Sequence, residues 1–156
     1  MSKLTPQYIA GLFDGEGWIS LRPQSQKRYL SSITIHIGIG MTNSIILKFH
    51  KKFGGYLNIS PETEKHKKCY KWSLGTKKQI KKFLTIIYPY LIVKKEQAKI
   101  MLKFIDLKTV SRRKRNSYLV YRALKYINKI RYLNGRVKRN PISVKYGNKK
   151  YQLIGL

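Results

Sequence analysis

Two carboxylates lie close together near the start of the chain, within residues 8–17, which read YIAGLFDGEG. Asp14 and Glu16 are two of only 6 acidic residues in a chain with 34 lysines and arginines and a formal net charge of +28. In so cationic a chain a surface carboxylate has no general advantage, so its place among glycines indicates a catalytic or metal-binding role. Asp often satisfies backbone groups at helix ends, so a structural role is an equal alternative for Asp14.

A predicted helix positions these acids. Thr5 is a favourable N-cap and Pro6 a favourable first helical residue, so the helix should begin there and run to about Gly15. Gly15 and Gly17 stand at its end, as glycines do where a chain leaves a helix.

The same helix has a face of small residues. Ala10, Gly11 and Asp14 are small or short, and Gly11 and Gly15 lie one turn apart. Small residues at this spacing let a second helix approach backbone to backbone. We therefore expect this face to pack against another helix.

The net charge limits the partners to nucleic acid, an anionic membrane or an acidic protein. No apolar run approaches the roughly 20 residues that span a bilayer, and the N-terminus lacks the pattern of a signal peptide. Nucleic acid is therefore the expected partner, with no membrane involved. Cys69 is the only cysteine, which excludes an intrachain disulfide and fits a reducing, intracellular compartment, either a prokaryotic cytoplasm or an organelle.

Hydrophobic periodicity predicts the elements that follow the first helix. Thr42 or Asn43 should cap the second helix, and Pro89 should end the third. The predicted elements are strands at about 18–24 and 32–40, a helix ending near 53, strands at 56–60 and 69–74, and helices at 76–87 and 94–107. This order is a mixed α+β unit rather than the strict βαβ alternation of a doubly wound fold.

A C-terminal extension follows. It begins with a basic run at 111–115 and continues with a predicted helix at 116–133 and a hairpin at 142–146 and 150–154. We expect a core domain at residues 1–110. Residues 111–156 should form a C-terminal helix and a basic tail that either packs on the core or contacts DNA.

Residues 9–17, IAGLFDGEG, resemble the signature of the LAGLIDADG homing endonucleases at nearly every position. The element order, FGGY at 53–56, and Pro89 followed by KKEQA at 94–98 also resemble that family. The resemblance covers roughly residues 5 to 107. It implies an α+β fold, an αββαββα saddle with an antiparallel four-strand sheet, with an extra C-terminal helix on this chain.

The resemblance also implies a function, that of a site-specific double-strand DNA endonuclease. Family chains that carry one motif form homodimers, in which two motif helices pack at a two-fold axis and cut a long, roughly palindromic site. It places Ala10, Gly11 and Asp14 at the dimer interface, with Asp14 otherwise in a structural role near the site.

The catalytic residues are carried over from the same motif. Glu16 matches the metal-binding acid, and Gly15 would offer its carbonyl to Mg²⁺ or Mn²⁺. Lys94 matches a basic residue near the scissile phosphate in some members, although a lysine at a helix start can also be simply solvated. Phosphodiester hydrolysis needs an activated water and neutralised phosphate charge, which a bound divalent cation can supply.

The polar faces of the predicted strands would read DNA in the major groove. They comprise Ser20, Arg22, Gln24, Ser32, Thr34, His36, Asn58, Ser60, Lys71 and Ser73. Each could equally belong to a solvated strand face. Loop residues Lys27 and Arg28, with other basic loop residues, better suit phosphates.

One position departs from the family. Relatives often carry Gln or Asn at the position of Met41, and a shift of one residue would instead place Thr42 or Asn43 there. An intron RNA maturase, or a DNA-binding regulator that does not cut, therefore remains an alternative on the same scaffold. A ribosomal-protein-like RNA binder would explain the charge but not the motif. The sequence does not distinguish an intron-encoded protein from a free-standing one.

Overall fold

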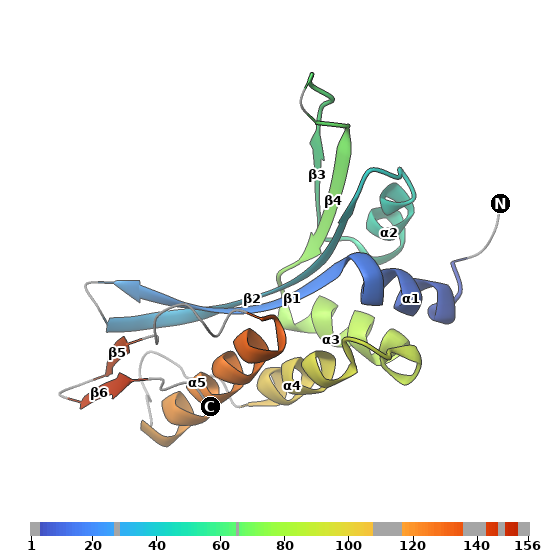
Figure 1. Cartoon of the computed structure of the whole chain (residues 1–156). Helices are drawn as coiled ribbons and strands as arrows, with labels where there is room; N and C mark the ends of the chain where they lie inside the picture. The colour runs from blue at the N-terminus through green and yellow to red at the C-terminus, as the bar shows by residue number, and fades with distance from the viewer. Residues whose placement is uncertain are drawn as a thin grey trace. The chain divides into compact units, whose positions relative to one another are not determined.

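The computed structural model describes residues 4–26, 29–64, 66–107, 117–135, 143–146 and 149–152 (Figure 1). The predicted α+β order is confirmed over these ranges. The elements are α1 (Pro6–Glu16), β1 (Gly17–Gln26), β2 (Tyr29–Met41), α2 (Ile46–Phe53), β3 (Tyr56–Ser60), β4 (Cys69–Leu74), α3 (Lys77–Ile87), the 3₁₀ turn η1 (Tyr88–Tyr90), α4 (Lys95–Asp106), α5 (Ser117–Leu133), β5 (Ser143–Tyr146) and β6 (Lys149–Gln152).

The chain divides into two compact units. The first unit comprises Met1–Ile19 and His36–Ala98, and the second comprises Ser20–Ile35 and Lys99–Leu156. Each is assembled from two separate stretches of chain, because β1, β2 and α4 pass from one unit to the other. The domain boundary predicted after residue 110 falls outside the described residues and stays a prediction.

The described strands form one sheet. β4 lies between β3 and β2 and pairs antiparallel with both, while β1 pairs with β2. These four strands are the predicted sheet. The C-terminal hairpin was also predicted, and it extends the sheet: β5 pairs in parallel with β2 at Tyr29 and Lys145, and β6 pairs antiparallel with β5.

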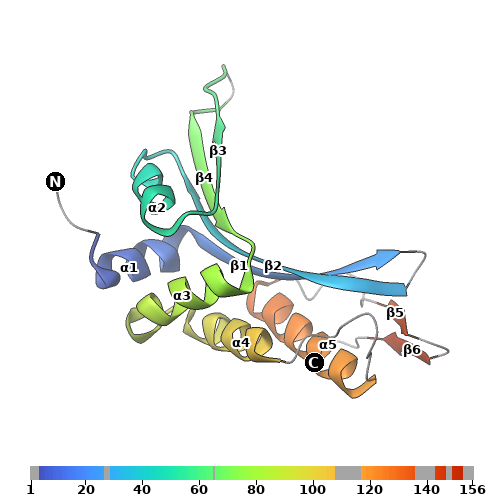
Figure 2. The same ribbon diagram turned by 180° about the vertical axis from the view of Figure 1, so that it is seen from behind.

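Aromatic side chains form the core of the first unit. Phe83 on α3 lies 5.4 Å from Phe13 on α1 and 5.1 Å from both Phe53 on α2 and Trp72 on β4, between ring centroids. Trp72 is fully buried, and its indole Nε1 donates to the Gly54 carbonyl at 2.7 Å. The cluster joins three helices to β4, and the views from both sides agree that α2 lies beside β4 and α3 beside α1 (Figures 1 and 2).

The start of α2 differs from the prediction. Its N-cap is Ile45, without a side-chain hydrogen bond, so neither Thr42 nor Asn43 caps the helix. The Asn43 side chain instead accepts a hydrogen bond from the Ile45 backbone at 2.9 Å and closes the preceding turn. The end is as predicted, because Gly54 adopts a positive φ of 67° that favours glycine.

The second unit has a helical core from α5 and the latter part of α4. Phe104 on α4 meets Tyr126 on α5 edge to face, with centroids 6.5 Å apart. Leu124, Ile127 and Ile130 are buried along one side of α5, as its helical periodicity predicts. Over the ranges described, no helix is both long and apolar enough to cross a membrane.

Candidate metal centre and DNA-binding face

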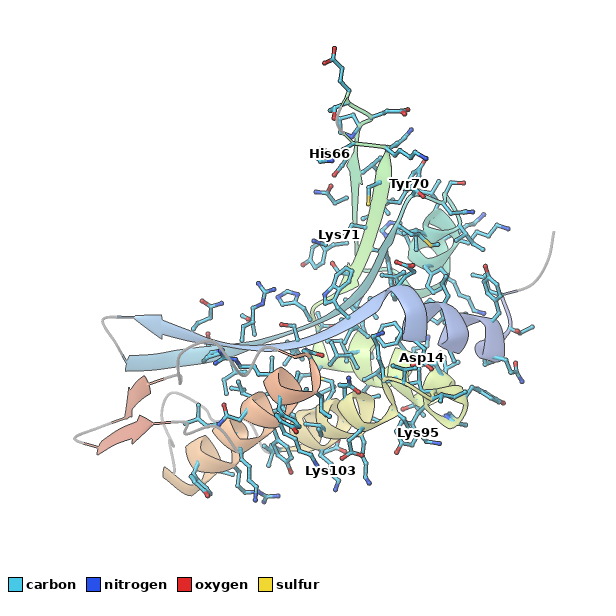
Figure 3. All side chains as sticks on the ribbon, in the orientation of Figure 1. Asp14, His66, Tyr70, Lys71, Lys95 and Lys103 are labelled. Atoms are coloured by element: carbon cyan, nitrogen blue, oxygen red, sulfur yellow. The ribbon has the colours of Figure 1, made fainter. Side chains whose placement is uncertain are left out.

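Asp14 lies near the end of α1 and is bound to backbone groups that are distant in the chain. Its carboxylate accepts hydrogen bonds from three consecutive backbone N–H groups, those of Ile92 at 2.7 Å, Val93 at 3.2 Å and Lys94 at 2.8 Å. These groups form the turn that leads into α4, where a negative charge at a helix N-terminus is favourable. The carboxylate uses both oxygens to fasten this turn to α1, on which Asp14 is labelled in Figure 3.

Lys94 lies at the same helix end. Its ammonium donates a hydrogen bond to the backbone carbonyl of Asp14, and its side chain is half-buried. The positive charge therefore stands at the negative end of the α1 dipole, which stabilises it there. Tertiary contacts thus bring Lys94 to Asp14, which is 80 positions away in the chain. Asp14 precedes Glu16 by two residues, so Lys94 lies near the end of α1 that carries Glu16.

Glu16 is the last residue of α1 and is exposed. Because the helix ends there, the last carbonyls of α1, including that of Gly15, have no partner within the helix. An exposed carboxylate, a nearby carbonyl oxygen and the negative end of a helix form a donor set that suits a hard divalent cation. Over the described ranges no three His, Cys, Asp or Glu residues gather into a metal site.

Gly17 permits the tight turn from α1 into β1. A side chain there would collide with the Phe13 carbonyl and the Phe13 ring, and the Gly17 N–H donates to that carbonyl. Glycines often end helices because they adopt backbone conformations that other residues avoid, but the φ of Gly17 is −82°, which any residue can adopt. The requirement is space, since Phe13 belongs to the buried core.

The exposed face of α1 differs in part from the expected dimer interface. Gly11 and Gly15 are exposed, and a Cβ at either would meet nothing within 4 Å. Ala10 is fully buried inside its own protomer, which corrects its expected interface role, and the Asp14 carboxylate is bound to the turn before α4. Tyr8, 49% exposed, shares the glycine face at i and i+3 spacing and was missed in the sequence, although that spacing could have indicated it.

The strand register shows which polar residues share the open face of the sheet in the first unit. Lys71 lies opposite both Gly40 and Asn58, and Ser73 lies opposite Gly38. The alternating residues of β2 and β4 point to the other face of the sheet, where they are buried in the core: Ile37, Ile39, Trp72 and Leu74. The predicted members of this face are His36, Asn58, Ser60, Lys71 and Ser73, and each is exposed or half-buried. Lys71 lies on the side of β4 turned away from α2 (Figure 3).

In the second unit, the polar side chains of β1 and β2 bind one another. The Arg22 guanidinium donates from Nε to the Ser20 hydroxyl at 3.1 Å, and the Gln24 amide donates to the Thr34 hydroxyl at 3.4 Å. Ser20 is only 7% exposed, so it holds Arg22 rather than offering a contact of its own. Arg22, Gln24 and Ser32 are exposed, and their role in reading DNA stays a prediction.

The remaining predicted residues are the loop residues Lys27 and Arg28 and the alternatives at positions 41–43. Lys27 and Arg28 lie outside the described residues. Met41 ends β2 opposite Tyr70 and is half-buried. Thr42 and Asn43 are both exposed, and the amide oxygen of Asn43 accepts a hydrogen bond from the Ile45 backbone.

Residues 9–105 match the LAGLIDADG endonuclease family over more than half of the chain, and the protein belongs to that family. A comparison with curated protein sequences found no match.

Solved structures share the fold. One is the homing endonuclease I-CvuI, in complex with the I-CreI target in the presence of Mg, with a TM-score of 0.68, 20% identity and coverage of 87% of this chain and 85% of that one. Another is the archaeal intron-encoded homing endonuclease I-Vdi141I complexed with DNA, with a TM-score of 0.66, 18% identity and coverage of 95% and 89%. I-SmaMI bound to cleaved DNA has a TM-score of 0.63 at 16% identity, and the match covers 96% of this chain but 53% of that chain.

Proposed function

We propose that this protein is a site-specific double-strand DNA endonuclease that hydrolyses phosphodiester bonds with Mg²⁺ or a similar divalent cation. The observation that carries the proposal is the division of roles between the two acids of α1. The Asp14 carboxylate accepts three backbone hydrogen bonds, whereas Glu16, two residues later, is exposed. The exposed carboxylate is the one that can bind a ligand.

The residues at this helix end have separate tasks. The Glu16 carboxylate and the Gly15 carbonyl would hold the cation, which when bound neutralises phosphate charge and activates water. Lys94 would supply a fixed positive charge beside the phosphate. Asp14 would position Lys94, because it binds the backbone of that residue and of the two before it.

We also propose that two copies act together across the glycine face of α1. Gly11 and Gly15 leave α1 open to close approach, and Tyr8 provides apolar surface beside them. Ile92 and Val93 are 85% and 69% exposed on the turn fastened to α1 by Asp14. Exposed apolar groups gathered in this way are typical of an interface. A two-fold dimer would place one Glu16 at each strand of a long, roughly palindromic site.

The function is tested by digesting a library of randomised DNA duplexes with the purified protein, with and without Mg²⁺. We expect double-strand cleavage at one long, roughly palindromic sequence, which stops when the metal is chelated. Sedimentation of the complex on the recovered site should give two protein chains per duplex. Tight binding to a duplex or to an intron RNA without cleavage at any Mg²⁺ or Mn²⁺ concentration would contradict the enzymatic assignment.

A further inference from the structure

The open face of the sheet in the first unit carries the indole ring of Trp18 among its polar side chains. Trp18, near the start of β1, lies with its indole across β2 at Gly38 and Gly40. A Cβ at Gly38 would collide with this ring, and a Cβ at Gly40 would lie 3.7 Å from its Cζ3. The ring therefore occupies space that side chains of β2 would otherwise fill.

Trp18 is not a core residue. The aromatic core on the other side of the sheet contains Trp72, which is fully buried, whereas Trp18 is half-buried on the open side. The Lys71 ammonium lies 5.2 Å from the Trp18 ring centroid, a cation–π distance. The indole ring of Trp18 thus lies beside the exposed Lys71 on the side of the sheet opposite the core.

We propose that Trp18 is a specificity-determining residue that contacts the methyl group of a thymine in the major groove. This inference rests on the proposed function, because it takes the open face as the DNA-reading surface. Of the groups that base pairs present in the major groove, the C5-methyl of thymine is the apolar one, so it is the group that an indole ring can recognise. Lys71, held over the ring, would pair with an adjacent phosphate or a guanine acceptor.

The place of Trp18 in the chain predicts which base pair is read. Trp18 follows the metal-binding candidate Glu16 by two residues, and consecutive Cα atoms are about 3.8 Å apart. The thymine should therefore lie close to the cleaved bond. Asn58 and Ser60, farther along β3, would read positions farther from it.

Deoxyuridine tests this contact, because it differs from thymidine only by the missing methyl group. Each thymine of the recovered site is replaced singly, and affinity is measured without cleavage, with Ca²⁺ in place of Mg²⁺. For the wild-type protein we expect one thymine in each half-site whose replacement weakens binding by about three- to tenfold, in line with the loss of one buried methyl. For Trp18→Ala the same replacement should have no effect.

Tyr56→Ala is the matched control. Tyr56 is a strongly exposed aromatic residue on the open face, opposite Ser73, so this variant removes a ring of similar size without touching Trp18. It should retain the wild-type response to deoxyuridine at that thymine. The inference is wrong if no thymine is more sensitive to methyl loss in the wild type than in Trp18→Ala.

Fluorescence gives a second readout that does not depend on cleavage. The chain has two tryptophans, and Trp72 is fully buried, so a change in emission on binding DNA should come from Trp18. Trp18→Phe should abolish this change while still binding the site. If the variant shows the wild-type change, Trp18 does not contact DNA. Cleavage without any methyl effect would contradict this inference alone, whereas no cleavage of any duplex would contradict the proposed function.

Discussion

Two regions of the molecule share an arrangement in which one polar side chain is bound internally and its neighbour is exposed. These regions are the end of α1 and the polar face of the hairpin formed by β1 and β2. At the helix end, the Asp14 carboxylate is bound internally, whereas Glu16 is exposed. On the hairpin, Ser20 is buried and holds Arg22, which is exposed. The two regions differ in how much depends on each exposed group. The proposed chemistry relies on one carboxylate per protomer, whereas the proposed DNA recognition is shared among many strand residues. A single substitution should therefore have a large effect in the first region and a small one in the second.

The largest effect is expected for Glu16→Gln, which keeps the shape of the side chain and removes its charge. Loss of a metal ligand should reduce the single-turnover cleavage rate by about a thousandfold or more, while affinity for the site changes by less than about threefold. Glu62→Gln is the matched control, since Glu62 is equally exposed but lies beyond the end of β3. Cleavage by Glu16→Gln at the wild-type rate would remove the central residue of the proposed site.

Gly11→Leu tests whether the helix end works alone or as one half of a pair. The position is open within the protomer, so folding should be unchanged or slightly stabilised, by up to about 1 kcal/mol, because leucine favours helix over glycine. The added side chain should prevent close approach of a second α1, and cleavage should fall by roughly a hundredfold or more. Sedimentation on DNA should then give one chain per duplex.

The control for this variant is Lys78→Leu, which adds a leucine at an exposed position of α3. It should leave both dimer formation and cleavage unchanged. A dimeric, active Gly11→Leu protein would show that the two copies meet elsewhere.

Asp14→Ala should affect both stability and chemistry. Its carboxylate makes three hydrogen bonds to backbone N–H groups, so we expect a loss of about 2–3 kcal/mol in the free energy of unfolding, measured with urea. Cleavage should fall by roughly ten- to a hundredfold because Lys94 is less firmly placed. Lys94→Met should reduce cleavage with a stability loss below about 1 kcal/mol. Equal stability losses in the two variants would argue against this separation of roles.

The smallest effects should come from the hairpin. Arg22→Ala should relax the preference at one base pair per half-site by about tenfold, measured by binding to sites with single substitutions. Ser20→Ala should relax the same position by about two- to threefold, because the hydroxyl only orients the guanidinium. The double variant should match Arg22→Ala alone. A change at a different base pair in Ser20→Ala would show that Ser20 does not act through Arg22.

Much of the fold could be predicted because its signals are local. Alternation of isoleucines predicted β2, and the capping residue Thr76, which accepts from the Gln79 backbone, was placed at the start of α3. The cap of α2 was wrong because a side chain such as Asn43 can close a turn as easily as it caps a helix. Trp18 was assigned only to a strand, since nothing nearby in sequence shows that Gly38 and Gly40 leave room for its ring.

In the segment that carries the proposed chemistry, the sequence alone determined that two acids stand at the end of a glycine-rich helix in a strongly basic chain, and it assigned the family. The family resemblance gave the two acids different expected roles, but only the tertiary structure shows what Asp14 binds. The partners of Asp14 lie 78 to 80 residues away, and the pairing of a carboxylate with distant backbone groups leaves no periodic signal in the sequence. Exposure of Glu16 follows from the same packing, because burial depends on which elements meet and not on the residue type alone.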